Sequence, residues 1–185
     1  MTSKARFRPA LLATLLLSAS PAVAFELHSP DFTDKSPVPE RNVFAGFGCA
    51  GTNQSPALSW TEPPAGTRSL AVTIYDPDAP TGSGWWHWVV FNLPPDTRGL
   101  PAGAGDPATP LLPPGAVQSR TDYGIAGYGG PCPPQGDKPH RYVVTVHALK
   151  TDHLPLPADA SGAMVGFNLN AASLAKATLT ARYGR

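Results

Sequence analysis

Apolar runs with the spacing of buried strands dominate the pattern of hydrophobic and polar positions along the chain. Residues 69–75, SLAVTIY, place apolar side chains on both faces of an extended segment, and residues 88–93, WVVFNL, do the same. A strand that is apolar on both faces is covered on both, so we expect these two strands to be central and adjacent. Residues 141–149, RYVVTVHAL, have high β propensity, and residues 57–60, ALSW, predict a short further strand. The pattern predicts a mainly β, antiparallel fold.

Helical character is confined to the C-terminal part of the chain. Residues 159–162, DASG, are suited to begin a helix, and residues 167–177 have modest helical propensity, before a last predicted strand at 178–184. Two long loops, at 94–118 and 127–140, are rich in proline and glycine. Because the 23 prolines and 18 glycines cluster between β-type segments, they indicate loops on a compact β scaffold rather than disorder.

The first 24 residues have the features of an export signal. Three basic residues precede an apolar core at 10–20 that is too short to span a bilayer, and AVA at 22–24 is a small-x-small cleavage signal. We therefore expect cleavage after Ala24 and one domain over 25–185, in the periplasm or secreted. The alternative is an uncleaved anchor. No other run approaches the length of a membrane span, so no transmembrane segment is expected after cleavage.

The charge balance excludes several partners. The whole chain carries a formal charge of +1, and removal of the three basic residues among the first 24 leaves 11 Lys and Arg against 13 Asp and Glu, a net charge of −2. The sequence has no basic stripe, which argues against nucleic acid as a partner and gives no reason to expect an anionic membrane surface.

Two cysteines, Cys49 and Cys132, are the only ones in the chain. In an exported protein they are expected to form a disulfide, with two free thiols as the alternative. Such a bridge would hold the loop around Cys132 against the segment around Cys49.

Titratable side chains gather where predicted strands begin and end. Asp76 and Asp78 follow the first central strand, His87 opens the next one, and His140 and Tyr142 open a third after the second long loop. Two loops would then each deliver one histidine to the mouth of a strand. The alternative is structural, with the acids forming local Asx turns and the histidines packed and hydrogen-bonded.

Several chemistries fit these residues poorly. The sequence has no HExxH, HxH or cysteine-pair motif for zinc, no GxSxG elbow, and no P-loop or dinucleotide fingerprint. Asp76 and Asp78 share one turn, so they are unsuited to flank a scissile glycosidic bond. We therefore expect no metal, no cofactor and no enzymatic activity.

A small anion pocket fits best. Two imidazoles, a tyrosine hydroxyl and backbone N–H groups donate hydrogen bonds to phosphate or carboxylate oxygens, while Asp76 orients a histidine or accepts from a ligand ammonium group. Because a bound anion raises the pKa of a nearby imidazole, affinity is expected to increase as the pH falls through roughly 6.5.

The motifs at these positions resemble a known family. DPDAP at 76–80, His87 at the start of a strand, and the GPCPPxGxxPHRY pattern at 130–142 resemble the phosphatidylethanolamine-binding proteins (PEBP), also called Raf kinase inhibitor proteins. FGCAGTNQSPALSW at 47–60 and ASGAMVGFNLNA at 160–171 resemble its bacterial YbhB/YbcL branch.

The resemblance extends over residues 25–185 and carries several expectations. It implies a β-sandwich of two antiparallel sheets with Greek-key connections and short peripheral helices. It also implies a small pocket for phosphate-type headgroups. The residues expected to line this pocket are Asp76, Pro80, Trp85 at its rim, His87, Pro133, His140 and Tyr142. Asp78 is expected to brace the same loop, and the Ala79–Pro80 peptide bond to be cis.

The predicted function is that of a binding and regulatory protein with a small anionic ligand. A protein-interaction module, such as a protease inhibitor or a modulator of a host process, is the alternative, and a hydrolase using His87 or His140 is less favoured. Kinase inhibition, an activity of eukaryotic relatives, is not expected of a periplasmic protein. Eukaryotic members also have a C-terminal helix with a tyrosine near the pocket. The sequence here ends in a strand-like segment, so we expect that wall either to be missing or to come from another subunit, which leaves a homodimer open as a further expectation.

Overall fold

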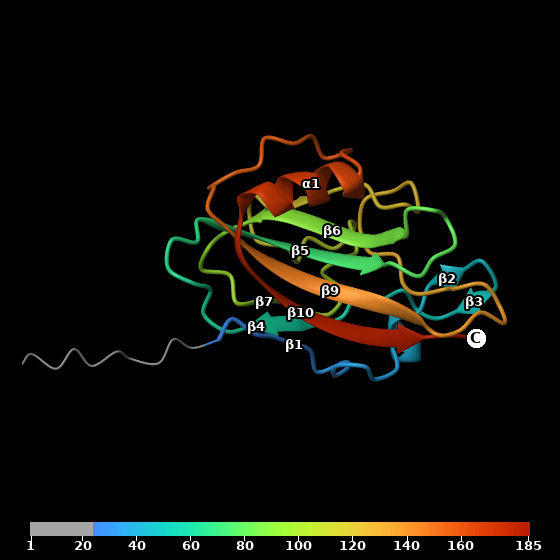
Figure 1. Ribbon diagram of the computed structural model, residues 1–185. Coiled ribbons are helices and arrows are strands. Elements are labelled where there is room, and N and C mark those ends of the chain that lie inside the picture. Colours follow the sequence, from blue (N-terminus) through green and yellow to red (C-terminus); the bar gives the residue numbers. More distant parts are fainter. Residues whose placement is uncertain (1–23) are drawn as a thin grey trace, which may run out of the picture.

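The computed structural model describes residues 24–185, so the expected export signal and its cleavage site lie almost entirely outside the described residues. Strands make up most of the regular structure, with one α-helix, α1 (Gly162–Ala172), and one 3-10 turn at Glu40–Asn42 (Figure 1). The strands in chain order are β1 (Leu27–His28), β2 (Ala45–Gly46), β3 (Cys49–Ala50), β4 (Leu58–Trp60), β5 (Ser69–Asp76), β6 (Trp85–Leu93), β7 (Gly99–Leu100), β8 (Val117–Gln118), β9 (His140–Leu149) and β10 (Ser173–Tyr183).

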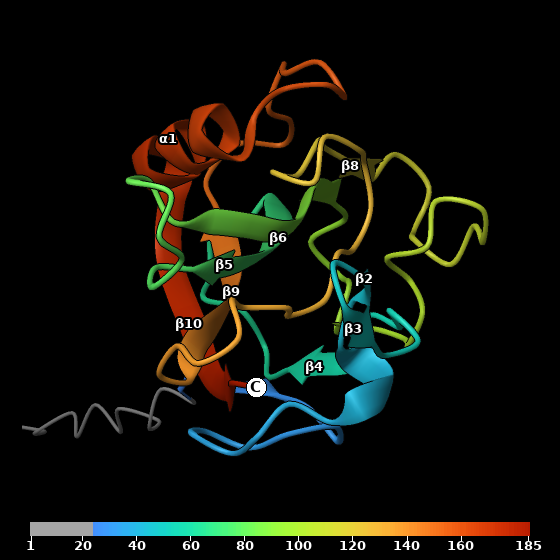
Figure 2. The same cartoon turned by 90° about the vertical axis from the view of Figure 1, so that its right-hand side faces the viewer.

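Two antiparallel sheets form the body of the molecule. The larger has the order β10-β9-β5-β6-β8, and a three-stranded sheet, β1-β4-β7, packs against one of its faces (Figures 1 and 2). After the β5–β6 hairpin the chain passes through β7 in the other sheet and β8 at one edge. It then returns to place β9 on the far side of β5, which is a Greek-key connection. This architecture confirms the predicted fold class, and a small ribbon, β2-β3, is added to it.

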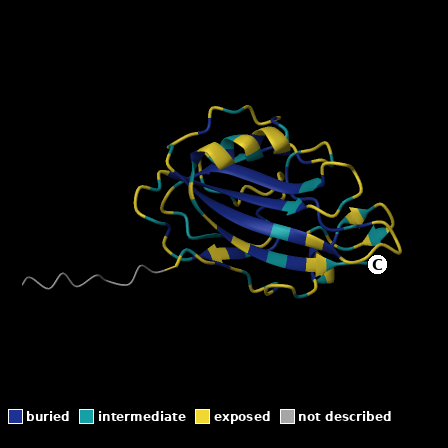
Figure 3. Cartoon of the chain, in the orientation of Figure 1, coloured by how far each residue is buried: buried dark blue, intermediate teal, exposed yellow. Residues whose placement is uncertain are grey.

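The large sheet is covered on both faces, as the sequence of β5 predicts. Leu70, Val72 and Ile74 face the core between the two sheets, whereas Ala71 faces a second core beneath α1. Figure 3 shows the central strands buried and the outer side of the helix exposed. Burial of apolar surface stabilises a fold by roughly 25 cal/mol per Å², so these strands contribute to stability through both of their faces.

The C-terminal segment differs from the prediction. The helix begins as expected, with Ser161 as its N-cap accepting a hydrogen bond from Met164 N, but it ends at Ala172. Residues 173–177, expected to be helical, belong to β10, which pairs with β9 along its whole length. Pairing with a long, buried neighbour strand overrides the modest helical propensity of this segment.

Cys49 and Cys132 form a disulfide, as predicted, across 83 residues of sequence. It joins β3 to the long loop that precedes β9. None of the helices in residues 24–185 is long and apolar enough to cross a membrane.

Candidate functional site

Three strand ends create the site. Because β5 runs antiparallel to both β6 and β9, the end of β5 lies beside the beginnings of the other two strands. Asp76, the last residue of β5, continues the face occupied by Leu70, Val72 and Ile74, and His140 continues the same face of β9. The inner face of the sheet therefore changes from apolar core to polar site at this edge.

A β-bulge places His87 on this inner face. β6 begins at Trp85, two residues before the predicted start, and its register shifts between the pairs Ile74–Trp88 and Tyr75–Trp86. His87 is the extra residue, so both it and Trp88 face inward while Trp86 faces α1. Bulges of this kind re-aim a side chain next to functional sites. Strict alternation from Trp88 would have turned the imidazole away from the cavity.

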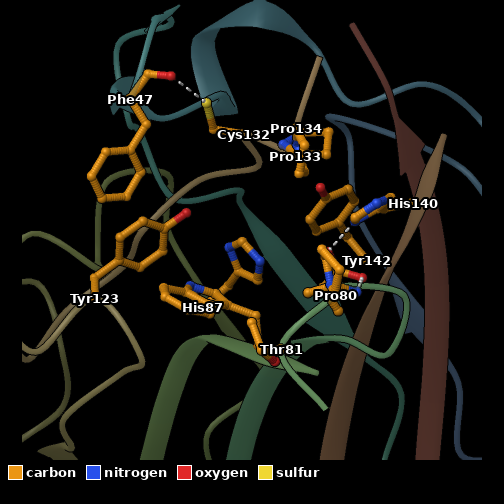
Figure 4. A pocket seen from close by; sticks show the side chains of 13 residues that line it. Phe47, Pro80, Thr81, His87, Tyr123, Cys132, Pro133, Pro134, His140 and Tyr142 are labelled. Carbon is orange, nitrogen blue, oxygen red and sulfur yellow. Dashed lines mark hydrogen bonds and ion pairs between the residues drawn. The ribbon is translucent and has the colours of Figure 1, made fainter. Parts of the chain in front are cut away.

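These residues surround a cavity of about 190 Å³, called here the histidine cavity (Figure 4). The residues that line it are Phe47, Asp76, Ala79, Pro80, Thr81, Trp85, His87, Tyr123, Cys132, Pro133, Pro134, His140 and Tyr142. The volume is below the range of roughly 300–1,000 Å³ typical of pockets for drug-sized ligands, so it suits a small group.

Asp76 orients His140. Its Oδ2 lies 2.7 Å from His140 Nδ1, and both side chains are almost fully buried. Because a carboxylate can only accept, Nδ1 carries a proton, and Nε2 is the ring nitrogen that points away from Asp76. The Nε2 atom lies 3.4 Å from Asp137 Oδ2. The other oxygen of Asp76 accepts from the backbone N–H groups of Asp78 and Ala79, so the Asx turn is formed as well.

Asp78 braces the β5–β6 loop. Its carboxylate accepts two hydrogen bonds from the Arg141 guanidinium, at 2.9 and 2.7 Å, and a third from Arg141 N. These bonds lower the pKa of Asp78 to about 2. The Ala79–Pro80 bond is trans, since no described residue has a cis peptide bond, and the expectation of a cis bond was wrong. The bonds to Asp76 and Asp78 hold the loop in its place.

His87 is held as one neutral tautomer. Its Nδ1 lies 2.6 Å from the carbonyl oxygen of Gly129, and a carbonyl only accepts, so Nδ1 carries the proton. Burial lowers the pKa of His87 to about 4, despite the Gly129 bond and the charge of Asp76, which act in the opposite direction. At neutral pH, Nε2 therefore has a lone pair. A side chain at position 129 would meet the Tyr123 ring at 2.3 Å, which explains the glycine at this close approach.

Two buried polar atoms of the lining residues have no hydrogen-bond partner: the Tyr142 hydroxyl and Trp85 Nε1. Burial, together with the charge of Asp76, raises the pKa of Tyr142 well above its usual value, so its hydroxyl stays protonated. An unpaired buried donor costs about 1–3 kcal/mol, and such groups in a native protein call for an explanation. Both belong to residues around the same cavity.

Aromatic rings and a C-terminal clamp form the rim. Tyr123 contacts His87 edge-on at 5.7 Å between ring centroids, and its ring stacks near Phe47, whose side chain is 70% exposed. The guanidinium of Arg185 donates to the carbonyl oxygens of Phe47, Gly48 and Pro133. This clamp ties two walls of the cavity together on the same side as the disulfide.

Comparison with known proteins assigns the chain to a family. The family model described as "Phosphatidylethanolamine-binding protein" matches residues 28–184. The chain is 51% identical to the UPF0098 protein YbcL of Escherichia coli K12 over 173 residues, which are 94% of each chain. The crystal structure of E. coli YbcL, titled a new member of the mammalian PEBP family, superposes with a TM-score of 0.85 over 87% of this chain and 98% of that one.

The chain belongs to the phosphatidylethanolamine-binding protein family.

Two further relatives agree with this assignment. The UPF0098 protein YbhB of E. coli K12 is 54% identical over 158 residues, which are 85% of this chain and 99% of YbhB. A putative lipoprotein, LppC of Mycobacterium tuberculosis, is 34% identical over 92% of this chain and 79% of that protein.

All seven residues expected from the PEBP motifs lie around the one cavity, and Asp78 lies just outside it in the brace described above. Sequence reasoning missed Phe47, Tyr123 and Arg185. Phe47 opens the motif at 47–60, but it lies in a loop, as does Tyr123, and Arg185 is the last residue, so no periodicity indicates where these side chains point. Within residues 24–185, no group of three or more His, Cys, Asp or Glu side chains is arranged to hold a metal ion.

Proposed function

We propose that this PEBP-family protein binds a small oxyanion, of the phosphate or phosphorylated-headgroup type, in the histidine cavity. Its role would be binding and regulation rather than catalysis.

The unpaired donors of the cavity carry this proposal. The Tyr142 hydroxyl and Trp85 Nε1 lack partners, while Nδ1 of each histidine and both oxygens of Asp76 are engaged by the protein. An oxyanion offers several acceptor lone pairs within a volume that fits about 190 Å³. Small rearrangement of the lining would let its oxygens pair with these donors, and such charge-assisted bonds are stronger than neutral ones.

His87 adds a requirement on the ligand. Its neutral Nε2 accepts, so at neutral pH it favours a ligand that brings a proton, such as the P–OH of phosphate or the ammonium of an ethanolamine headgroup. The pH at which this imidazole gains charge lies well below the value of about 6.5 for a free histidine. To the extent that it depends on His87, the expected rise in anion affinity on acidification should therefore occur well below pH 6.5.

A binding role also agrees with the fact that the two lining side chains that could act as nucleophiles, Thr81 and Cys132, are already bonded within the protein. Of the lining residues, Thr81 donates its hydroxyl to Gly84 O, and Cys132 is in the disulfide. Nδ1 of each histidine is fixed by an acceptor, which suits orientation of the ring toward a ligand.

We place the protein in the periplasm or cell envelope. The signal-like residues 1–24, the disulfide and the relative named as a lipoprotein support this location. N-terminal sequencing of protein from a periplasmic extract would test it, and a chain that retains residues 1–24 in the cytosol would contradict it.

Isothermal titration with inorganic phosphate and with phosphoethanolamine tests the binding proposal. We expect saturable binding by the wild type and a loss of about 1–3 kcal/mol for His140→Ala. The matched control is His153→Ala, which removes an exposed imidazole outside the cavity and should leave the affinity unchanged. Absence of heat with both ligands, or an equal loss of affinity in the His140→Ala and His153→Ala variants, would overturn the proposal.

A further inference from the structure

A second cleft lies on the opposite face of the large sheet, beneath α1. It has a volume of about 300 Å³ and is called here the threonine cleft. Its lining residues are Thr73, Tyr75, Trp86, Val143, Thr145, His147, Gly166, Leu169, Asn170, Lys176 and Thr178. The sheet separates it from the histidine cavity, and the two share no lining residue.

The strand register builds the polar floor of this cleft. Thr145 of β9 pairs with Thr73 of β5 on one side and with Thr178 of β10 on the other, which sets three hydroxyl-bearing side chains in a row. In the next row, His147 pairs with Lys176. Cross-strand neighbours on one face lie about 4.5–5.5 Å apart, so one small ligand can reach several of them.

Thr145 is only 9% exposed, and it lines the middle of this row between Thr73 and Thr178. Its neighbours are engaged: Thr73 Oγ1 and Ser173 Oγ each lie 3.3 Å from a ring nitrogen of His147. Threonine is the polar choice at a strand position that valine would fill equally well, so the hydroxyl of Thr145 adds a polar group to the floor of the cleft.

The charge of the cleft favours an anion. Burial, aided by the nearby Lys176, lowers the pKa of His147 to about 3, so this imidazole is neutral at physiological pH. Lys176 is then the only charged side chain of the lining, which includes no Asp, Glu or Arg. Its ammonium donates one hydrogen bond to Asn170 Oδ1 and keeps two donors free.

The roof of the cleft is apolar. The helix lies directly on the Trp86 indole, because a side chain at position 162 would meet this ring at 2.3 Å. Trp86 contacts Tyr75 at 4.7 Å between ring centroids, and Leu169 of α1 completes this wall. A ring on the ligand would pack against the half-buried Trp86 while its charged end meets the floor.

We propose that the threonine cleft is a second binding site, for a small organic carboxylate that carries an apolar ring. The carboxylate accepts from Lys176 and from the hydroxyls of Thr145 and Thr178, and the ring packs against the half-buried Trp86. This site is independent of the histidine cavity and of its proposed ligand.

Titration of the full-length mature protein with benzoate, followed by amide chemical shifts in ¹H–¹⁵N NMR spectra, tests this proposal. We expect saturable shifts centred on Thr145 and Lys176, and binding of the neutral analogue benzyl alcohol weaker by about tenfold. Benzoate shifts that are confined to the histidine cavity, or that do not saturate, would overturn the proposal.

Variants locate the contacts. Lys176→Gln should weaken benzoate binding by about tenfold, and the isosteric Thr145→Val by about fivefold, through the loss of hydrogen bonds to a charged group. The matched control is Lys150→Gln, since Lys150 is an exposed lysine that does not line the cleft. Equal affinity of the Lys176 and Lys150 variants would refute the assignment.

Discussion

The tautomer of His87 predicts that the cavity distinguishes phosphate from sulfate. The two anions have similar shape, but phosphate keeps at least one proton at neutral pH and sulfate has none. A phosphate P–OH can donate to the lone pair on His87 Nε2. A sulfate oxygen at the same place sets acceptor against acceptor, because Nδ1 is committed to the Gly129 carbonyl at 2.6 Å.

The size of this discrimination follows from the cost of a buried polar atom without a partner. That cost is about 1–3 kcal/mol, which corresponds to about 5- to 150-fold in affinity. Acidification should reduce this preference for phosphate over sulfate. If sulfate binds only the protonated imidazole, its affinity rises about tenfold per pH unit as the pH falls toward the His87 pKa of about 4, and levels off below it.

Isothermal titration with both anions, at neutral pH and at stepwise lower pH, measures the effect. His87→Gln supplies the matched variant, because its amide group can rotate to present either a donor or an acceptor. This variant should bind sulfate and phosphate with similar affinity and should lose the pH slope for sulfate. Equal affinity of the wild type for the two anions at neutral pH would refute the tautomer argument, as would a slope that persists in the variant.

Three further outcomes follow from single contacts. Tyr142→Phe should weaken phosphate binding by about 1–3 kcal/mol and leave the melting temperature unchanged or higher, because the removed hydroxyl has no partner in the free protein; a destabilised variant with normal affinity would contradict this. Replacing Cys49 and Cys132 together by Ala should lower the free energy of unfolding by about 4 kcal/mol in urea titrations, from the entropy of an 83-residue loop; an unchanged unfolding midpoint would argue against it. Asp78→Asn should lower the free energy of unfolding by about 1 kcal/mol at neutral pH, because it removes the ion pair with the half-exposed Arg141. This difference from the wild type should shrink as the pH falls below 3.8 toward about 2, where the wild-type carboxylate becomes protonated and uncharged. A difference that persists at low pH would exclude the ion pair as its cause.

The fold could be predicted because its strongest signals are local. The two-sided apolar pattern of 69–75 placed β5 at the centre of a sheet with both faces covered, and Ser161 was recognisable as a helix start. The end of the helix was not predictable from propensity, since residues 173–177 become a strand only through pairing with β9. The expectation of a cis Ala79–Pro80 bond rested on the family's proline turn alone, and the bond is trans.

Site residues at the ends of regular strands could be predicted from the sequence, whereas those in bulges and irregular loops could not. Asp76 and His140 fall on a face that the strand pattern defines, whereas His87 reaches the cavity only through a bulge that no periodicity reveals. Tyr123 and Arg185 come from irregular segments that are positioned by long-range contacts. Arg185 bonds the carbonyl oxygen of Pro133, 52 residues away, and Tyr123 bonds that of Gly130 within an irregular loop, so no strand or helix pattern indicates either contact.

The central claim is that one oxyanion lies between the two imidazoles of the histidine cavity. A crystal structure of the protein with phosphoethanolamine tests it most directly. We predict a phosphate group within hydrogen-bonding distance of the Tyr142 hydroxyl and Nε2 of His87 or His140. A phosphate group bound elsewhere on the molecule, with the side chains of this cavity still unpaired, would contradict the account.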